Sequence, residues 1–360
     1  MSIRINTKEL LTILETTPAN QNIMLVGKHG IGKSQILSDY FTSKRNKVVP
    51  LFLGQMSDPG DLIGLLHKND VTGRTEFMPP YWFPTDDTPV VLFLDELNRA
   101  RPEVLQTIMD LALNRTLAGK SLPKGSRIIS AVNNGEEYQL TDLDPALVSR
   151  FNIYDFCPTP NEWLLWAEKK QLDKRVIEFI SQNPDYLDGD GREIEDGSLE
   201  KSPDRRAWER VSQIIFTLKS EEINDTHKKI IAGIVGTKAT SKFFESLKTS
   251  IMLSAIDILT KDFELSKRLL SKYITPQFAV LNNNLFRTLE TASFSEKQKD
   301  LAAQNLQAYF DLLNQLKQRE AMAHFASIFS KPDYPNSLMF IIQYAPELYT
   351  KLTCFISEIR

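Results

Sequence analysis

The chain has 360 residues, of which 42% are hydrophobic and 25% charged, as in an ordinary soluble globular protein with room for two or three domains. Its net charge of −3 gives no electrostatic reason to expect a nucleic-acid partner, because phosphate backbones are bound by clustered Lys and Arg. Only Cys157 and Cys354 are present, far apart, which argues against a disulfide framework or a zinc site and favours a reducing compartment.

No segment approaches the ~20 apolar residues that a membrane span needs. The N-terminal stretch Met1–Glu15 mixes apolar with charged residues and lacks the uninterrupted apolar run of a signal peptide. We therefore expect a cytoplasmic protein without membrane insertion.

The first half of the chain alternates between short β-rich runs and helical stretches, which indicates βαβ units and an α/β core with a parallel sheet. Helices are predicted over Thr7–Thr16, with Thr7 as the candidate N-cap, and over Ser34–Arg45. The predicted strands are continuous or nearly continuous apolar runs, as expected of strands covered by helices on both faces. They are Asn22–Val26, Val48–Leu53, Pro89–Leu94 and Arg127–Val132.

The character of the chain changes near Cys157–Pro160, where we place a domain boundary. A helix is predicted over Asn161–Gln171, capped by its first residue, and from Ser202 onward the chain has the spacing of amphipathic helices almost throughout. Glycines interrupt this pattern near Gly233–Thr240, which indicates a second boundary. Three domains are expected: 1–158 (α/β), 159–245 (helical) and 246–360 (helical).

A glycine-rich segment joins the first predicted strand to the following helix and fits the phosphate-loop pattern G-x-x-x-x-G-K-[ST]. Its glycines let successive backbone N–H groups point at phosphate oxygens, and the helix presents its positive end to the same anion. Lys33 is expected to reach the β- and γ-phosphates, and the Ser34 hydroxyl to bind Mg²⁺. His29 is expected to be a solvent-facing spacer. The whole candidate ATP-binding segment is Gly27, Lys28, His29, Gly30, Ile31, Gly32, Lys33 and Ser34.

The strand Pro89–Leu94 ends in two carboxylates, Asp95 and Glu96. At the carboxyl end of a strand both can face the crevice where open α/β sheets bind ligands. Asp95 is then expected to hold Mg²⁺, through water or with Ser34, and Glu96 to orient and polarise the attacking water, which favours hydrolysis of the nucleotide. Taken alone, such a pair could equally cap the next helix.

Asn98 and Arg99 follow directly, before a helix that Pro102 is expected to open. Two interpretations of Asn98 and Arg99 stay open: a solvated helix cap, or a role at the edge of a subunit.

With these residues in place the sequence resembles the AAA+ superfamily, and within it the MoxR-like, dynein-related branch. The resemblance covers roughly residues 7–250. It implies a P-loop AAA+ α/β nucleotide-binding domain at 1–158, a helical lid at 159–245 and a helical C-terminal extension at 246–360. The segments that carry it are Gly27–Ser34, Gly54–Gly64, Asp95–Ala100 and Leu143–Phe151.

The resemblance also assigns roles to single residues. Asn133 matches the polar sensor between the acidic pair and the γ-phosphate. Arg150 matches the arginine that one subunit inserts into its neighbour's site, where a permanently charged guanidinium stabilises the transferring phosphoryl group. Arg206 resembles the second arginine sensor on the lid, although Asp204 and Arg205 alter the usual spacing, so Arg205 is an alternative.

Between the second and third predicted strands, Gly73–Phe83 matches the position of a hairpin insert that faces the pore or the client in this branch. Its aromatic residues either form an exposed contact surface or pack against the core; both interpretations stay open. The resemblance further implies an ATPase that works as a homo-oligomeric ring, expected to be a hexamer, with a chaperone-like action on a protein client and a von Willebrand factor A domain protein as partner.

Two other classes of protein share the ATP site. A nucleic-acid-directed AAA+ NTPase motor of the restriction type needs a basic channel, which the net charge of −3 does not favour. A self-contained P-loop kinase needs no Arg150 from a neighbouring subunit.

Overall fold

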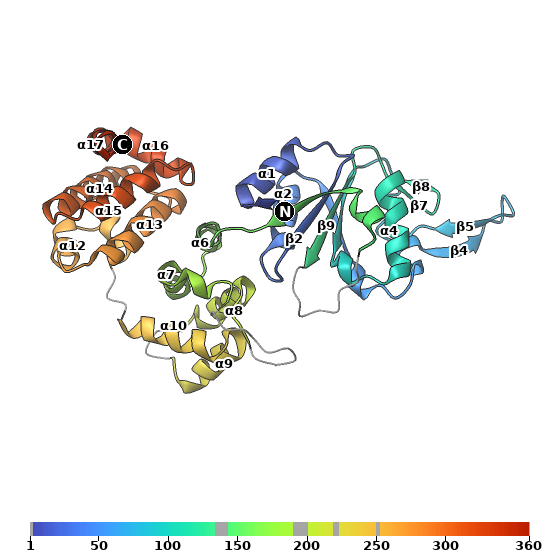
Figure 1. Ribbon diagram of the computed structural model, residues 1–360, viewed down its shortest axis with the longest axis horizontal. Helices are drawn as coiled ribbons and strands as arrows, with labels where there is room; N and C mark the ends of the chain where they lie inside the picture. Colours follow the sequence, from blue (N-terminus) through green and yellow to red (C-terminus); the bar gives the residue numbers. More distant parts are fainter. Residues whose placement is uncertain (1–2, 134–142, 190–200, 219–222, 250–252, 360) are drawn as a thin grey trace. The chain divides into compact units, whose positions relative to one another are not determined.

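The computed structural model describes residues 3–133, 143–189, 201–218, 223–249 and 253–359 (Figure 1). Its internal contacts divide the chain into two compact units. The first contains the chain up to Glu162 together with Asp204–Ala207. The second begins at Trp163 and contains the rest of the described chain.

The first unit is built on a six-stranded sheet in the order β1-β10-β2-β9-β6-β3, in which all neighbouring strands are parallel. The predicted parallel α/β core is therefore confirmed, and each predicted strand begins and ends within one residue of an observed one. The strands are β1 (Arg4–Ile5), β2 (Asn22–Gly27), β3 (Lys47–Phe52), β6 (Val90–Asp95), β9 (Arg127–Asn133) and β10 (Phe151–Phe156).

Helices cover both faces of this sheet, because alternate side chains of each buried strand point to opposite faces. Ile23 and Leu25 of β2 belong to one apolar cluster with α1 (Thr7–Thr16) and α2 (Lys33–Ser43). Met24, between them, belongs to a second cluster with α4 (Pro102–Asn114). Pro102 opens α4 as predicted.

Short elements complete the first unit. A hairpin of β4 (Leu65–Lys68) and β5 (Thr75–Met78) projects from the sheet layer (Figure 1). The remaining elements are the hairpin β7 (Thr116–Leu117) and β8 (Lys120–Ser121), the helices α3 (Gly60–Ile63) and α5 (Pro145–Val148), and the 3₁₀ turns η1 (Leu53–Gln55) and η2 (Leu97–Arg99).

From Trp163 onward all elements of the described chain are helices, as was predicted for the chain from Ser202 onward. No helix in the described ranges has the length and apolar character needed to cross a membrane. The helices are α6 (Pro160–Lys169), α7 (Lys174–Gln182), η3 (Pro184–Tyr186), α8 (Arg205–Ile215), α9 (Asp225–Val235), α10 (Thr237–Thr249), α11 (Ala255–Thr260), α12 (Phe263–Leu270), α13 (Thr275–Thr291), α14 (Glu296–Gln315), α15 (Arg319–Phe329), α16 (Pro335–Tyr344) and α17 (Pro346–Ile359).

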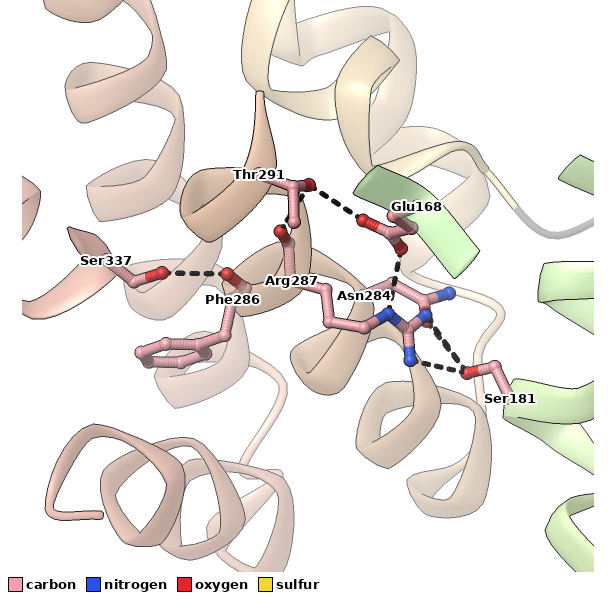
Figure 2. A network of polar contacts seen from close by, with 7 residues as sticks. All are labelled: Glu168, Ser181, Asn284, Phe286, Arg287, Thr291 and Ser337. Atoms are coloured by element: carbon pink, nitrogen blue, oxygen red, sulfur yellow. Dashed lines mark hydrogen bonds and ion pairs between the residues drawn. The ribbon is translucent and has the colours of Figure 1, made fainter. Parts of the chain in front are cut away.

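A buried polar network joins α13 to α6 and α7 inside the second unit (Figure 2). The guanidinium of Arg287, whose side chain is 2% exposed, donates to Glu168 at 2.9 Å and to Ser181 and Asn284. Thr291 donates to the other carboxylate oxygen of Glu168. A charge this deeply buried is tolerated because its hydrogen-bonding groups have partners.

Two predicted helix caps were wrong. The cap of α1 is Asn6, whose side chain accepts from the backbone N–H of Glu9 while the Glu9 carboxylate accepts from Asn6, so Thr7 is already the first helical residue. Asn161 lies inside α6, and Thr159 takes its place through a reciprocal pair of hydrogen bonds with Glu162. In both cases the partner three residues later decides which of two neighbouring polar residues is the cap.

Candidate nucleotide-binding site

The predicted phosphate loop lies between the end of β2 at Gly27 and the start of α2 at Lys33. Gly30 and Gly32 have φ values of +74° and +101°, which side chains rarely tolerate. This backbone curls at the amino end of α2, where N–H groups and the helix dipole favour an anion. His29 is exposed, as expected of a spacer.

Lys33 is buried at the floor of the loop. Its Nζ donates to three oxygens: the carbonyls of Gly27 at 2.8 Å and Lys28 at 3.0 Å, and Oδ1 of Asn133 at 2.9 Å. Burial lowers the pKa of Lys33 to about 8, against the opposing influence of Asp95 and Glu96. The three oxygens that Lys33 contacts are uncharged, so a bound phosphate would give its ammonium a negatively charged partner.

Ser34 and Asp95 meet across the sheet edge, where the Ser34 hydroxyl donates to Oδ2 of Asp95 at 3.0 Å. Both line a hollow of about 390 Å³ between α2, β3 and β6. A hydroxyl and a carboxylate are hard oxygen donors of the kind that Mg²⁺ prefers. No group of three or more His, Cys, Asp or Glu in the described ranges could hold a metal by itself.

Glu96 follows β6 in a left-handed conformation with φ of +55°. Its Oε1 accepts from Nη1 of Arg99 at 2.8 Å. A Cβ built on Gly54 would lie 3.1 Å both from Oε2 of Glu96 and from Cβ of Arg99, so the absence of a side chain at Gly54 makes room for the pair. The structure thus places Glu96 one residue beyond Asp95, at the same edge of the sheet.

Asn133 ends β9, the strand between β2 and β6. In addition to its side-chain contact with Lys33, both of its main-chain groups meet the side chain of Asn98. Asn98 is 4% exposed, so its interpretation as a solvated helix cap is wrong. The structure therefore brings together the predicted residues Lys33, Ser34, Asp95 and Asn133, with Glu96 beside them.

The segment that contains this edge of the sheet is similar to a known family of domains. Residues 22–151 match the AAA domain of the dynein-related subfamily, a stretch that begins with β2 and includes every residue of the cluster just described. Residues 22–151 are an AAA domain.

Among curated proteins, BssE of Thauera aromatica, described as a candidate chaperone, is 27% identical over 175 residues. The match covers 46% of this chain and 59% of BssE, so the chain spans less than two thirds of that relative's length.

Two solved structures are also similar. NtrX of Brucella abortus in complex with ADP is 15% identical, with 86% of this chain and 68% of NtrX covered and a TM-score of 0.37. RuvB of Thermotoga maritima, a Holliday junction branch migration motor, is 17% identical, with 72% of this chain and 76% of RuvB covered and a TM-score of 0.35.

Arg150 lies at the other end of the AAA domain's sheet. It precedes Phe151, which is in register with Asn22 at the start of β2, whereas the phosphate loop follows the end of β2. The length of β2 separates the two ends by about 17 Å. Arg150 bonds the carbonyl of Ala146, and its Nε is buried without a partner among the described residues. Arg150 is therefore not part of the cluster in its own chain.

The two candidate lid arginines differ in burial. Arg205 is buried and donates to the carbonyl of Pro158 at 2.5 Å, whereas Arg206 is exposed. The carboxylate of Asp204 lies against the phosphate loop, 3.1 Å from a Cβ built on Gly30, and also accepts from the N–H of Ala207.

Sequence reasoning missed two contributors to the AAA domain's site. The hydrogen bonds between Asn98 and Asn133 join residues 35 positions apart. The space beside Gly54 is used by the side chains of Glu96 and Arg99, which come from another part of the chain. A polar residue between the apolar Leu97 and the helix start was the available signal for Asn98, but its partner could not be read from the sequence.

Proposed function

We propose that this protein is an AAA+ ATPase of the MoxR type that binds MgATP at Gly27–Ser34 and hydrolyses it to ADP and phosphate. The observation that carries the proposal is the convergence of a buried lysine, a hydroxyl–carboxylate pair and a second carboxylate at one edge of the sheet. The AAA-domain match over residues 22–151 supports it.

Each group has a chemical task in this proposal. Lys33 would exchange one of its three oxygen acceptors for a β- or γ-phosphate oxygen, and the backbone of the loop would hold the remaining charge. Ser34 and Asp95 would hold the Mg²⁺ that accompanies the nucleotide. Glu96 would orient the attacking water, for which its carboxylate must be free of Arg99.

Hydrolysis would require assembly into a homo-oligomeric ring, for which we propose a hexamer. Arg150 lies about 17 Å from its own phosphate loop along β2 and so serves as the arginine donated to a neighbouring subunit. A head-to-tail contact of this kind forms a ring when the rotation between neighbouring subunits closes. We propose the exposed Arg206 as the sensor on the lid. The proposed domains are an AAA+ domain at 1–158, a lid at 159–245 and a C-terminal extension at 246–360.

The proposed use of the hydrolysis cycle is the remodelling or assembly of a protein client in the cytoplasm. The hairpin supports this, because Leu65, Leu66, Val71 and Met78 on it and Tyr81 just beyond are exposed, and such a group of apolar side chains marks a protein contact. The neighbouring Trp82 and Phe83 are buried in the core. In this proposal the aromatic segment therefore both packs against the core and contributes to the exposed contact surface. BssE, the similar protein, is itself described as a candidate chaperone.

We further propose a von Willebrand factor A domain protein as partner, on the resemblance to the MoxR-like branch. Affinity purification followed by mass spectrometry tests this partner, and the reproducible absence of any such domain would contradict it.

Phosphate release from MgATP, measured across protein concentration for the wild type and Glu96→Gln, tests the enzymatic proposal. We expect turnover per subunit to rise with concentration as the ring forms and to fall at least about 100-fold in Glu96→Gln, with MgATP binding retained. Turnover that does not depend on concentration would contradict the shared site. Unchanged turnover in Glu96→Gln would contradict the role of Glu96, and stimulation by DNA or RNA would favour a nucleic-acid motor.

A further inference from the structure

Asn98 lies next to the part of β9 that extends beyond its pairing with β6. β6 pairs with β9 only as far as Leu94 and Ser130, and Asn133 lies beyond this last pair. On its other side β9 remains paired with β2 through Gly27. On the side that faces β6, no strand among the described residues therefore pairs with Asn133.

The side chain of Asn98 fills this gap. Its Nδ2 donates to the carbonyl of Asn133 at 2.9 Å, and its Oδ1 accepts from the N–H of Asn133 at 3.4 Å. A carboxamide carries a donor and an acceptor side by side, as a peptide group does, so it can replace a strand residue. Both residues are buried, so water does not compete for these bonds.

Asn133 in turn reaches the nucleotide site through its side chain, which accepts from Nζ of Lys33 at 2.9 Å. The direction of that side chain follows from the backbone that Asn98 holds. Both polar atoms of the Asn98 side chain are directed at the Asn133 backbone, so Asn98 acts on the site through Asn133.

We infer that Asn98 is a positioning residue for ATP hydrolysis, acting through both main-chain groups of Asn133 to aim the Asn133 amide at the γ-phosphate end of the site. This inference rests on the proposed function. It requires an amide at position 98: Ala removes both bonds, and Asp keeps an acceptor but loses the donor and places a carboxylate against a carbonyl oxygen.

A double-mutant cycle on hydrolysis tests the inference. Asn98→Ala is expected to lower kcat about 10- to 100-fold with KM for MgATP changed less than about threefold, because misaimed groups slow the chemistry more than they weaken binding. In an Asn133→Ala background the same substitution is expected to change kcat less than about twofold. An equal loss in both backgrounds, or no loss in either, overturns the inference.

Loss of a buried amide also weakens the fold, so Asn98→Asp and a matched control accompany the cycle. Asn305 is a buried asparagine of the second unit that donates to the carbonyls of Ile258, Leu259 and Lys261. Asn305→Asp is expected to lower the melting temperature as Asn98→Asp does while leaving kcat of the folded protein within about twofold. A similar fall of kcat in both variants would mean a general structural effect and would overturn the inference.

Hydrogen exchange separates this inference from the proposed function. In nucleotide-free protein the amide of Asn133 is expected to exchange at least about tenfold faster in Asn98→Ala than in the wild type, and unchanged in Asn305→Asp. If the wild type binds MgATP but does not hydrolyse it, the proposed function fails. The exchange rate of the Asn133 amide then tests only whether Asn98 holds the Asn133 backbone. An unchanged rate in Asn98→Ala overturns the inference.

Discussion

Nζ of Lys33 lies 2.9 Å from Oδ1 of Asn133, a contact between residues 100 positions apart in the chain. It joins the phosphate loop after β2 to the end of the neighbouring strand β9. Two residues expected from separate motifs thereby belong to one hydrogen-bonded cluster. The protonation of Lys33 within this cluster can be measured through its effect on nucleotide binding.

Nucleotide binding is expected to depend on pH through Lys33. Burial lowers its pKa to about 8, so below pH 8 the free protein already carries the ammonium that a phosphate needs. Above pH 8 the free side chain is neutral, and binding must take up a proton, so affinity falls by up to tenfold per pH unit. Calorimetry at pH 7 and pH 9, in two buffers of different ionisation enthalpy, should show close to one proton taken up only at pH 9.

Lys33→Arg is the control for this dependence. A guanidinium stays charged throughout this range, so the variant is expected to bind more weakly but with an affinity that does not change between pH 7 and pH 9. Equal affinity of the wild type at both pH values would show that Lys33 has the same charge in the free and the bound protein throughout this range, or that it does not meet the phosphate.

Subunits lacking Arg150 are expected to complement subunits lacking Lys33. In a ring assembled at random from equal amounts of Arg150→Ala and Lys33→Ala, about a quarter of the interfaces combine an intact loop with an intact arginine. Mixing two inactive proteins should therefore restore about a quarter of the wild-type rate in a phosphate-release assay. Activity of Arg150→Ala alone at the wild-type rate, or no recovery on mixing, would count against a donated arginine.

Removing the buried guanidinium of Arg287 is expected to destabilise the second unit strongly. Arg287→Met leaves the carboxylate of Glu168, 18% exposed, without its ionic partner, and breaking a buried pair in this way costs about 3–5 kcal/mol. Urea unfolding followed by tryptophan fluorescence measures the loss, since Trp163, Trp166 and Trp208 lie in this unit.

The matched control is the pair of Lys351 and Asp311, which is short at 2.6 Å but 42% and 39% exposed. Lys351→Met is expected to cost no more than about 1 kcal/mol, because water screens the pair. Replacing Glu168 by Leu together with Arg287→Met should recover part of the larger loss. Equal losses in the two single variants would mean that burial does not set the strength of the network.

Two glycines of the β4–β5 hairpin region are expected to respond differently to alanine. A Cβ on Gly64, where φ is +87°, would lie 1.9 Å from the carbonyl oxygen of Met78. A Cβ on Gly73, where φ is +68°, would meet nothing within 4 Å. Gly73→Ala should cost about 1–2 kcal/mol from the backbone conformation alone, and Gly64→Ala several kcal/mol more because the hairpin backbone must also move. Thermal unfolding of both variants checks this, and equal melting temperatures would contradict it.

The sequence by itself determined the parts of this protein that depend on neighbours along the chain. The phosphate loop needs only a strand, glycines at fixed spacing and a helix, all of which lie within Asn22–Ser43. Apolar runs such as Pro89–Leu94 identified buried strands, because parallel strands covered on both faces carry few polar side chains. The helices after Ser202 followed from their amphipathic spacing.

Only the tertiary structure decided relations between residues far apart in the chain. It separated the buried Arg205 from the exposed Arg206, which adjoin in sequence, and it buried Trp82 while leaving the adjacent Tyr81 97% exposed. It placed Asn98 on Asn133, and it set Arg150 at the far end of the sheet from Gly27. Local patterns encode which elements form, but strand order and register determine which side chains meet, and these depend on packing across the whole sheet.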